Sequence, residues 1–226
     1  MERNNFLFRL GEKSAVWWIA ALSAIFYLIE IIIFGINGDN IAYIALSASN
    51  FLSGKYLWTI ITHIFAHGSL LHLFVNMFAL ISIGGICERI IGRKRFTWLY
   101  LLSGVFAGLL SVSLAGFFGF GFWERVFGSP EVYMLGASGA IFAVAGLFVV
   151  LVPKARFSII FFPFFSMPGY ILVPSMLILM WAASIFAGLP IGNVAHFGGF
   201  IAGAAYGFYL RKKYRRKIEM LQRYFK

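Results

Sequence analysis

The stretch 135–146, LGASGAIFAVAG, sets one serine, Ser138, between two glycines at the start of an apolar run. No charged residue lies within it. A run of this kind belongs in a lipid-facing or deeply buried helix, where polar groups are costly and are therefore functional candidates. The stretch predicts a membrane helix that begins close to a serine, and it makes Ser138 the first residue to explain.

The composition of the whole chain agrees with a membrane protein. The sequence has 226 residues, 61% apolar and 12% charged, whereas soluble domains carry about 25% charged residues. A helix needs about 20 apolar residues to cross a bilayer. The first apolar run exceeds the core of a signal peptide and no small-residue cleavage site follows it. We therefore predict an all-α membrane protein, a six-helix bundle with spans at about residues 16–36, 69–87, 96–116, 132–152, 169–188 and 193–210.

The distribution of positive charge predicts the orientation of these spans. The formal net charge is +11, and 17 of the 19 Lys and Arg residues lie in the joints on one side, at residues 1–15, 88–95, 153–156 and 211–226. The positive-inside rule assigns this side to the cytoplasm. We expect a cytoplasmic segment (1–15), a six-span domain (16–210) in the cell membrane and a basic tail (211–226) against anionic headgroups. No soluble domain is left to present the charge to a nucleic acid.

Two connections are apolar without being long enough to span. Residues 37–68 are expected to lie in the outer interface, with Tyr43, Tyr56 and Trp58 at headgroup level. Residues 157–168 contain two prolines and are expected to form an interfacial lead into the fifth span. The lone cysteine, Cys87, excludes a disulfide framework and is interpreted as a small packing residue.

The polar residues inside the spans form a short set, which is Glu30, His72, Asn76, Ser138 and His196. His72, Ser138 and His196 each lie near the start of a span that runs from outside to inside. At about 1.5 Å per residue, Ser138 lies about 9 Å below the outer surface. The topology therefore predicts that these three side chains share the outer half of the membrane.

The surroundings of Ser138 suggest a site for a developing oxyanion. His72 and Asn76 are four residues apart and share one face of the second span. Two preorganised donors opposite a serine can stabilise an oxyanion by about 3 to 4 kcal/mol each. Ser138 also opens a helix, where free N–H groups favour an anion. Gly136 and Gly139 remove side chains on either side of it, which allows close approach.

Two seams of small residues are expected to bring His196 to Ser138. Glycines recur every four residues along the sixth span and small residues recur along the fourth, a pattern typical of close helix contact. They are Gly199, Gly203 and Gly207 on the sixth span, and Ala140, Ala143 and Gly146 on the fourth. Contact between the seams would let the His196 imidazole act as general base and then as general acid.

No carboxylate is expected behind this histidine. The single Asp of the chain, Asp39, lies in the outer connection, and Glu30 belongs to the first span. The usual triad has such a carboxylate, so the sequence predicts a Ser–His dyad instead. Phe142, one turn below Ser138, is expected to lie against the imidazole ring and orient it.

These motifs together resemble the rhomboid family of intramembrane serine proteases. The shared blocks are GASG around Ser138, HGSLLHLFVN from His67 to Asn76, AHFGGFIAG around His196 and the joint ERIIGRKRFTWLYLLSG. They occur in the family's order and cover most of residues 58–210. Two positions depart from the pattern of many members: Thr59 stands where an arginine follows the tryptophan, and Phe142 stands where some members have tyrosine.

The resemblance implies both an activity and its site. It implies hydrolysis, through an acyl-enzyme, of peptide bonds in the transmembrane segments of other membrane proteins, without a cofactor. Ser138 would be the nucleophile and His196 the base. The oxyanion hole would be His72, Asn76 and the Ser138 N–H, in a water-filled cavity open to the outside. The fifth span and its loop, residues 188–193, would form the gate for substrate.

Three other functions are considered from the sequence. A noncatalytic relative that binds and escorts membrane proteins would not need the serine or the histidine. A metalloprotease would need two histidines flanking a glutamate, but apolar residues separate His63 from His67. A transporter would carry paired charges near the midplane. We interpret His67 as a structural hydrogen-bonding residue and His63 as interfacial, and Glu30 has no assigned role.

Overall fold

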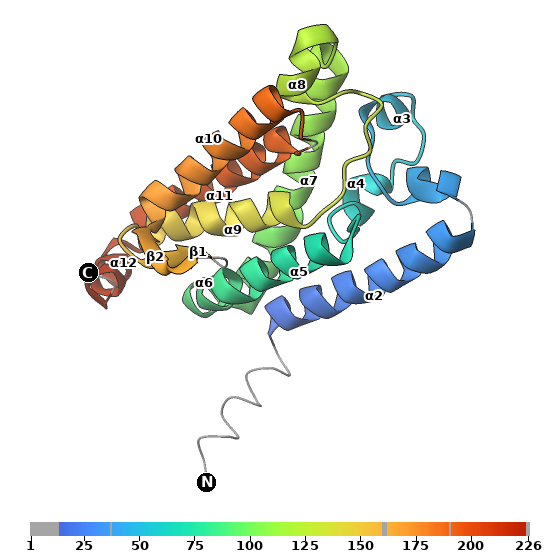
Figure 1. Ribbon diagram of the computed structural model, residues 1–226. Helices are drawn as coiled ribbons and strands as arrows, with labels where there is room; N and C mark the ends of the chain where they lie inside the picture. The colour runs from blue at the N-terminus through green and yellow to red at the C-terminus, as the bar shows by residue number, and fades with distance from the viewer. Residues whose placement is uncertain (1–13, 37, 160–161, 190, 225–226) are drawn as a thin grey trace.

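The computed structural model describes residues 14–36, 38–159, 162–189 and 191–224, and these residues are mostly helical (Figure 1). The predicted segment 1–15 lies outside the described residues, apart from its last two. Three short elements are the 3₁₀ helices η1 (Gly38–Tyr43) and η3 (Gly121–Trp123) and the π-helical turn η2 (Leu80–Gly84). The α-helices are α2 (Ala15–Ile36), α3 (Ala48–Leu52), α4 (Thr59–Thr62), α5 (Leu70–Ala79), α6 (Gly85–Ile91), α7 (Arg93–Phe118), α8 (Glu124–Phe127), α9 (Ser138–Leu151), α10 (Gly169–Ala187), α11 (Asn193–Lys213) and α12 (Arg215–Tyr224).

Several of these helices have the length and composition of membrane spans. In the described part of the chain, four pass this test, namely Ala15–Ile32, Leu70–Ile91, Arg93–Phe118 and Gly169–Ala187. The second of them joins α5, η2 and α6 into one helix, which contains the π-helical turn. The molecule is therefore a multi-pass membrane protein. The remaining two predicted spans correspond to α9 and α11, so that six spans stay a prediction.

The fourth predicted span, 132–152, is wrong at its start. α9 begins at Ser138 and has 14 residues, and residues 132–137 are not helical. Leu46 and Met134 form an antiparallel bridge instead, with reciprocal backbone hydrogen bonds of 2.9 and 2.7 Å. The backbone of these residues is thus used by the outer connection, and the helix starts only at the serine.

Helix α9 lies at the centre of the molecule, with α10 and α11 on one side and α5 on the other (Figure 1). Most of its residues are buried. The close approach of α11 depends on the predicted seam of small residues. A Cβ on Gly199 would overlap the carbonyl oxygen of Gly139, and a Cβ on Gly203 would overlap that of Ala143. The predicted contact between the two seams is confirmed.

A small hairpin makes the prediction of an all-α fold wrong in one place. Strands β1 (Arg156–Ile159) and β2 (Phe162–Pro168) pair antiparallel ahead of α10. The pairs include Arg156 with Pro168 and Ser158 with Ser166. Proline is tolerated at the end of an edge strand because its missing N–H leaves no ladder bond unmade. The two prolines therefore exclude a helix here, as expected, without excluding extended pairing.

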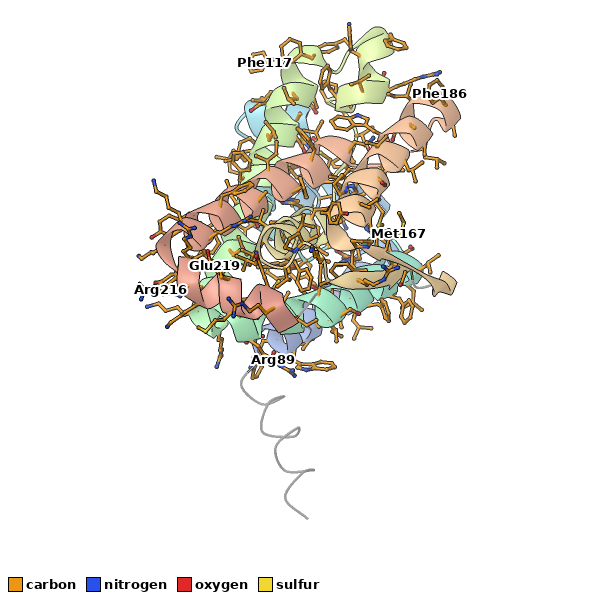
Figure 2. The ribbon with its side chains drawn as sticks, turned by 90° about the vertical axis from the view of Figure 1, so that its left-hand side faces the viewer. Arg89, Phe117, Met167, Phe186, Arg216 and Glu219 are labelled. Carbon is orange, nitrogen blue, oxygen red and sulfur yellow. The ribbon has the colours of Figure 1, made fainter. Side chains whose placement is uncertain are left out.

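The basic tail at 211–226 also contains a helix, which the sequence did not predict. Helix α12 folds against the end of the bundle, where Ile218 is buried and the Gln222 side chain donates to the carbonyl of Leu151 at 2.9 Å. Figure 2 shows Arg89 and Arg216 toward one end of the molecule and Phe117 and Phe186 at the other. We call the end that carries α12 the basic end.

Candidate functional site

The hydroxyl of Ser138 and the imidazole of His196 are in direct contact. Ser138 Oγ lies 2.7 Å from Nε2 of His196, although 58 residues separate them in the sequence. Ser138 is the first residue of α9, and His196 lies one turn into α11. The glycine contacts between these two helices hold the pair at hydrogen-bonding distance. In this arrangement the hydroxyl donates to Nε2, which can accept its proton.

The backbone before Ser138 is fixed by the outer connection. The N–H of Gly136 donates to the carbonyl of His63 at 2.8 Å. Gly136 has a φ of +130°, a conformation that side-chain-bearing residues rarely adopt. The turn that presents Ser138 therefore requires glycine at this position, and a backbone hydrogen bond to His63 holds the turn in place.

Gly136 also allows the His72 ring to pack close to the Ser138 turn. A Cβ at Gly136 would lie 2.9 Å from Cε1 and 3.0 Å from Nε2 of His72, and 3.6 Å from Ser138 Oγ. A single carbon atom would thus contact both side chains. Glycine at this position therefore lets the His72 ring lie directly against the turn that presents Ser138, and a side chain there would displace the ring.

Asn76 lies one turn below His72 on α5. Its side chain is 6% exposed, and within the described residues its Nδ2 has no hydrogen-bond partner. A buried polar group left unpaired costs about 1 to 3 kcal/mol. Groups of this kind call for a ligand, a water molecule or a functional role. An amide donor without a partner is suited to an incoming oxygen atom.

The His196 ring is held by packing on one side. Phe142 lies against it, with ring centroids 4.7 Å apart and an interplanar angle of 30°. His196 Nδ1 is buried and has no hydrogen-bond partner among the described residues. If Nε2 accepts from Ser138, Nδ1 carries the proton of the neutral ring. In this structure the position of a triad carboxylate is thus not filled by any described side chain.

His67 supports the neighbourhood of His72 from behind. Its Nδ1 donates to the carbonyl of Phe65 at 2.9 Å, and its ring packs edge-on against His72, with centroids 5.2 Å apart. Its backbone N–H reaches the buried carboxylate of Glu30. His67 therefore forms the structural hydrogen bonds expected of it, and Glu30 has a partner that the sequence did not reveal. Burial lowers the pKa of His67 to about 4.

The side chain of His63 is buried within the protein, and its position at the membrane interface stays a prediction. The side chain is 6% exposed, its Nδ1 donates to the carbonyl of Thr59 at 2.8 Å, and its ring lies against Gly108 of α7. Burial lowers its pKa to about 4. Thr59 is also buried and donates to the carbonyl of Tyr56 at 2.7 Å. The Thr59 hydroxyl therefore forms a local hydrogen bond within this part of the outer connection.

The aromatic residues expected at headgroup level form one cluster. Tyr43 and Tyr56 are in edge contact at 4.9 Å, and Tyr56 and Trp58 at 5.6 Å. Trp58 Nε1 donates to the Tyr43 carbonyl at 2.9 Å. The cluster ties Tyr43 to the chain around Tyr56 and Trp58 within the outer connection.

Glu88 is a structural residue that sequence reasoning missed. Its carboxylate accepts hydrogen bonds from the Ser14 hydroxyl at 2.7 Å and from the N–H groups of Ala15 and Val16 at 2.8 and 3.2 Å. It therefore caps the N-terminus of α2 from another helix, where a negative charge is favourable. An acidic residue in an otherwise basic joint was the available signal.

The described residues contain no group of three His, Cys, Asp or Glu side chains that could hold a metal ion. Although the chain has four histidines, two of them use Nδ1 for backbone carbonyls. The site is thus built from a serine, imidazoles and an amide, which is the donor set of acyl-transfer chemistry.

The fold and this site define a helical membrane protein with a serine–histidine pair at the start of a central helix. A family model for the rhomboid domain matches residues 54–213. The chain belongs to the rhomboid family.

Several relatives have known names. Rhomboid protease GlpG of Haemophilus influenzae is 27% identical over 216 residues, which cover 95% of this chain and 99% of the relative. Rhomboid-like protease 3 of Toxoplasma gondii is 27% identical over 220 residues, covering 95% and 74%. Rhomboid protein 1, mitochondrial, of Saccharomyces cerevisiae is 31% identical over 176 residues, covering 74% and 47%, so this chain spans about half of that relative.

Proposed function

We propose that this protein is an intramembrane serine endopeptidase that cleaves transmembrane segments of other membrane proteins with a Ser138–His196 dyad. The observation that carries the proposal is the 2.7 Å contact between Ser138 Oγ and His196 Nε2. Nucleophile and base at this separation are the signature of covalent acyl transfer. Two relatives are named as proteases, and they give the proposal its family context.

The first half of the reaction forms an acyl-enzyme. Ser138 Oγ attacks the scissile carbonyl carbon while His196 Nε2 takes the hydroxyl proton. The carbonyl oxygen becomes an oxyanion, for which His72, Asn76 and the Ser138 N–H supply donors. The unpartnered amide of Asn76 and the close packing of His72 against the Ser138 turn support this role. The intermediate then collapses, the C–N bond breaks, and His196 gives its proton to the leaving amine.

The second half releases the acyl group. His196 Nε2 takes a proton from a water molecule, whose oxygen attacks the ester carbon. The same donors stabilise the second oxyanion. The ester bond breaks, the new carboxyl group leaves, and Ser138 regains its proton from His196. Phe142 keeps the imidazole in one orientation through both halves, in place of a third polar residue.

The proposed substrates are spans that unwind readily. A regular helix hides its carbonyls in hydrogen bonds, so a span with Gly or another helix breaker near its end is easier to open. We propose entry from the lipid past α10 and the loop 188–193, of which residue 190 lies outside the described residues. Pro174 lies within α10, and the left-handed Gly188, with φ of +66°, follows its last residue, so this helix is irregular near the proposed entry.

We propose the cell membrane as the location, with the basic end in the cytoplasm and the site opening on the other side. The positive-inside rule is the basis for this orientation. Several relatives carry a mitochondrial name. Fractionation of the source cells, with protease accessibility of tags at the two termini, tests the location and the orientation together.

Reconstitution with a tagged single-span substrate tests the activity. We expect cleavage by the wild type and loss of it in Ser138→Ala and in His196→Ala. Ser113→Ala is a matched control, since this exposed serine donates to the carbonyl of its own helix at 2.9 Å. Cleavage at the wild-type rate by Ser138→Ala would overturn the dyad. Substrate retention without cleavage by the wild type would instead favour the noncatalytic binding role.

A fluorophosphonate probe gives a second, substrate-independent test. It reacts with an activated serine, so labelling of the wild type and loss of label in Ser138→Ala are expected. Persistent labelling of that variant would mean that another serine is the nucleophile. Cleavage that continues in a strong chelator would argue against metal-dependent hydrolysis.

A further inference from the structure

A groove on the outer surface of the bundle lies away from the Ser138 site, between α7 and α11. Its volume is about 530 Å³. Trp98, Leu102 and Phe106 form its α7 wall, at four-residue intervals along one helix face, and they are 55%, 60% and 45% exposed. Ala202 and Tyr206 form the α11 wall. The groove is therefore an apolar channel on a surface that faces lipid.

The end of the groove nearest the basic end is positively charged. Lys94 and Arg95, in the first turn of α7, line it. The Arg95 guanidinium donates to the Tyr214 hydroxyl at 3.1 Å and lies 5.4 Å from the centre of its ring. Lys213 donates to the Tyr209 hydroxyl at 2.9 Å and lies over the same Tyr214 ring. Two cations thus line this mouth of the groove, and a third, Lys213, is linked to Arg95 through the Tyr214 ring.

These cations lack acidic neighbours in the part of the chain that the structure describes. The ion pair found there joins Arg215 to Glu219 on α12, and neither Lys94, Arg95 nor Lys213 pairs with a carboxylate. Phenol hydroxyls and ring faces hold Arg95 and Lys213 without neutralising them. The mouth therefore keeps its charge for an anion from outside the chain.

We propose that this groove is a binding site for an anionic glycerophospholipid. Lys94 and Arg95 contact its phosphate, and an acyl chain lies along Trp98, Leu102 and Phe106. From Lys94 to Phe106 is about 18 Å along the helix, close to the ~15 Å of half a hydrocarbon core. Trp98 then lies near headgroup level, where tryptophan is enriched. A helix of another protein would match the apolar wall but not the charged mouth.

The site differs from a diffuse attraction between a basic tail and a charged membrane. It joins a headgroup contact on α7 to an apolar wall shared with α11, so a bound lipid bridges the two helices. Both parts are needed for selective retention. The proposal does not depend on the proposed proteolysis, because lipid binding is measured without substrate.

Native mass spectrometry of protein extracted from vesicles of equal phosphatidylglycerol and phosphatidylcholine content tests the site. The wild type should retain phosphatidylglycerol in preference to phosphatidylcholine. Lys94→Gln with Arg95→Gln should weaken phosphatidylglycerol binding about 30-fold, since each surface cation contributes about fivefold to binding an anionic lipid. Ala202→Trp should abolish retention of either lipid by filling the groove. This single substitution also decides the question if the double variant does not fold.

Two matched controls distinguish loss of this site from the effect of removing two charges or adding one large side chain elsewhere on the surface. Arg216→Gln with Lys217→Gln removes the same number of charges from exposed positions on α12, and Ala205→Trp adds the same bulk to an exposed position on α11. Both should retain lipid as the wild type does. Equal retention of the two lipids by the wild type would overturn the proposal. The proposal would also be overturned if the charge control lost as much phosphatidylglycerol binding as the Lys94 and Arg95 double variant, or if Ala202→Trp retained lipid at the wild-type level.

Discussion

Both carboxylate oxygens of Glu30 accept the backbone N–H of His67, at 3.1 and 3.0 Å. The contact joins α2 to the chain just before α5, across 37 residues of sequence. Glu30 is 1% exposed. Because His67 packs against His72, the carboxylate of an outlying helix fixes the backbone behind the proposed oxyanion hole.

Replacing Glu30 by alanine should therefore destabilise the protein. The N–H of His67 would lose its buried acceptor, at a cost of about 1 to 3 kcal/mol. We expect a lower midpoint of thermal unfolding in detergent and a lower kcat for a tagged substrate, because His72 loses its support.

Glu30→Gln provides the matched comparison. The amide oxygen can still accept the N–H, so most of the stability should remain. A Gln variant as unstable as the Ala variant would show that the charge matters more than the hydrogen bond. Wild-type behaviour of both variants would contradict the bracing role.

Gly199→Ala should disrupt the contact between α9 and α11. The added methyl group would overlap the carbonyl oxygen of Gly139, next to the nucleophile. A backbone carbonyl cannot rotate away as a side chain can. We therefore expect the free energy of unfolding to fall by at least the roughly 1 to 3 kcal/mol typical of overpacking, together with a large loss of cleavage. Thermal unfolding and the fluorophosphonate labelling rate measure the two effects.

The control for this substitution is Gly85→Ala. A Cβ at Gly85 would meet no atom within 4 Å, and alanine is favoured over glycine in a helix by about 1 kcal/mol. We expect unchanged or slightly raised stability. If Gly199→Ala were equally harmless, the glycine seam would not determine the helix approach.

Much of the arrangement could be predicted because its signals are local. Glycines at four-residue spacing indicated which face of α11 packs closely. The positions of His72, Ser138 and His196 near the starts of inward-running spans predicted that the three residues lie at a similar depth. The start of α9 was mispredicted because apolar character continues through residues 132–137. Their backbone pairs with Leu46 instead, and a long-range bridge leaves no mark on hydropathy.

Partners that reach across the chain could not be predicted in the same way. Glu30 and His67, or Glu88 and the start of α2, meet only once the helices are packed. A single glutamate in an apolar run shows that a partner is needed but does not identify it. The burial of His63 could not be predicted for the same reason, since the glycine that makes room for its ring, Gly108, belongs to another helix.

Acid should destabilise the protein through His63. Burial lowers the pKa of this imidazole from 6.5 to about 4. Between these two pH values the unfolded chain binds a proton that the folded chain excludes, so stability falls as pH drops, by up to about 1.4 kcal/mol per pH unit. Above pH 6.5 both states are neutral and this contribution vanishes.

Unfolding midpoints measured from pH 8 to pH 4.5 test this linkage. His63→Gln keeps an N–H donor for the Thr59 carbonyl but does not titrate, so its midpoint should fall less steeply below pH 6.5 than that of the wild type. Parallel curves for the two proteins would show that other groups govern the acid response.

Phe142 should act on the rate through the orientation of His196. Its ring lies 4.7 Å from the imidazole, and Nδ1 of that imidazole has no polar partner in the described part of the chain. Phe142→Ala removes the contact and lets the ring rotate away from Ser138. Aromatic pairs are worth about 0.5 to 1.5 kcal/mol, so we expect a threefold to tenfold lower kcat, on the order of that energy.

The tyrosine variant distinguishes orientation from simple packing. Phe142→Tyr keeps the aromatic face, so kcat should stay near the wild-type value, whereas Phe142→Leu fills similar space without a ring and should behave like alanine in kcat but not in stability. Measuring KM alongside kcat separates substrate binding from chemistry. If leucine supported the full rate, the aromatic ring would not be what holds His196 in place.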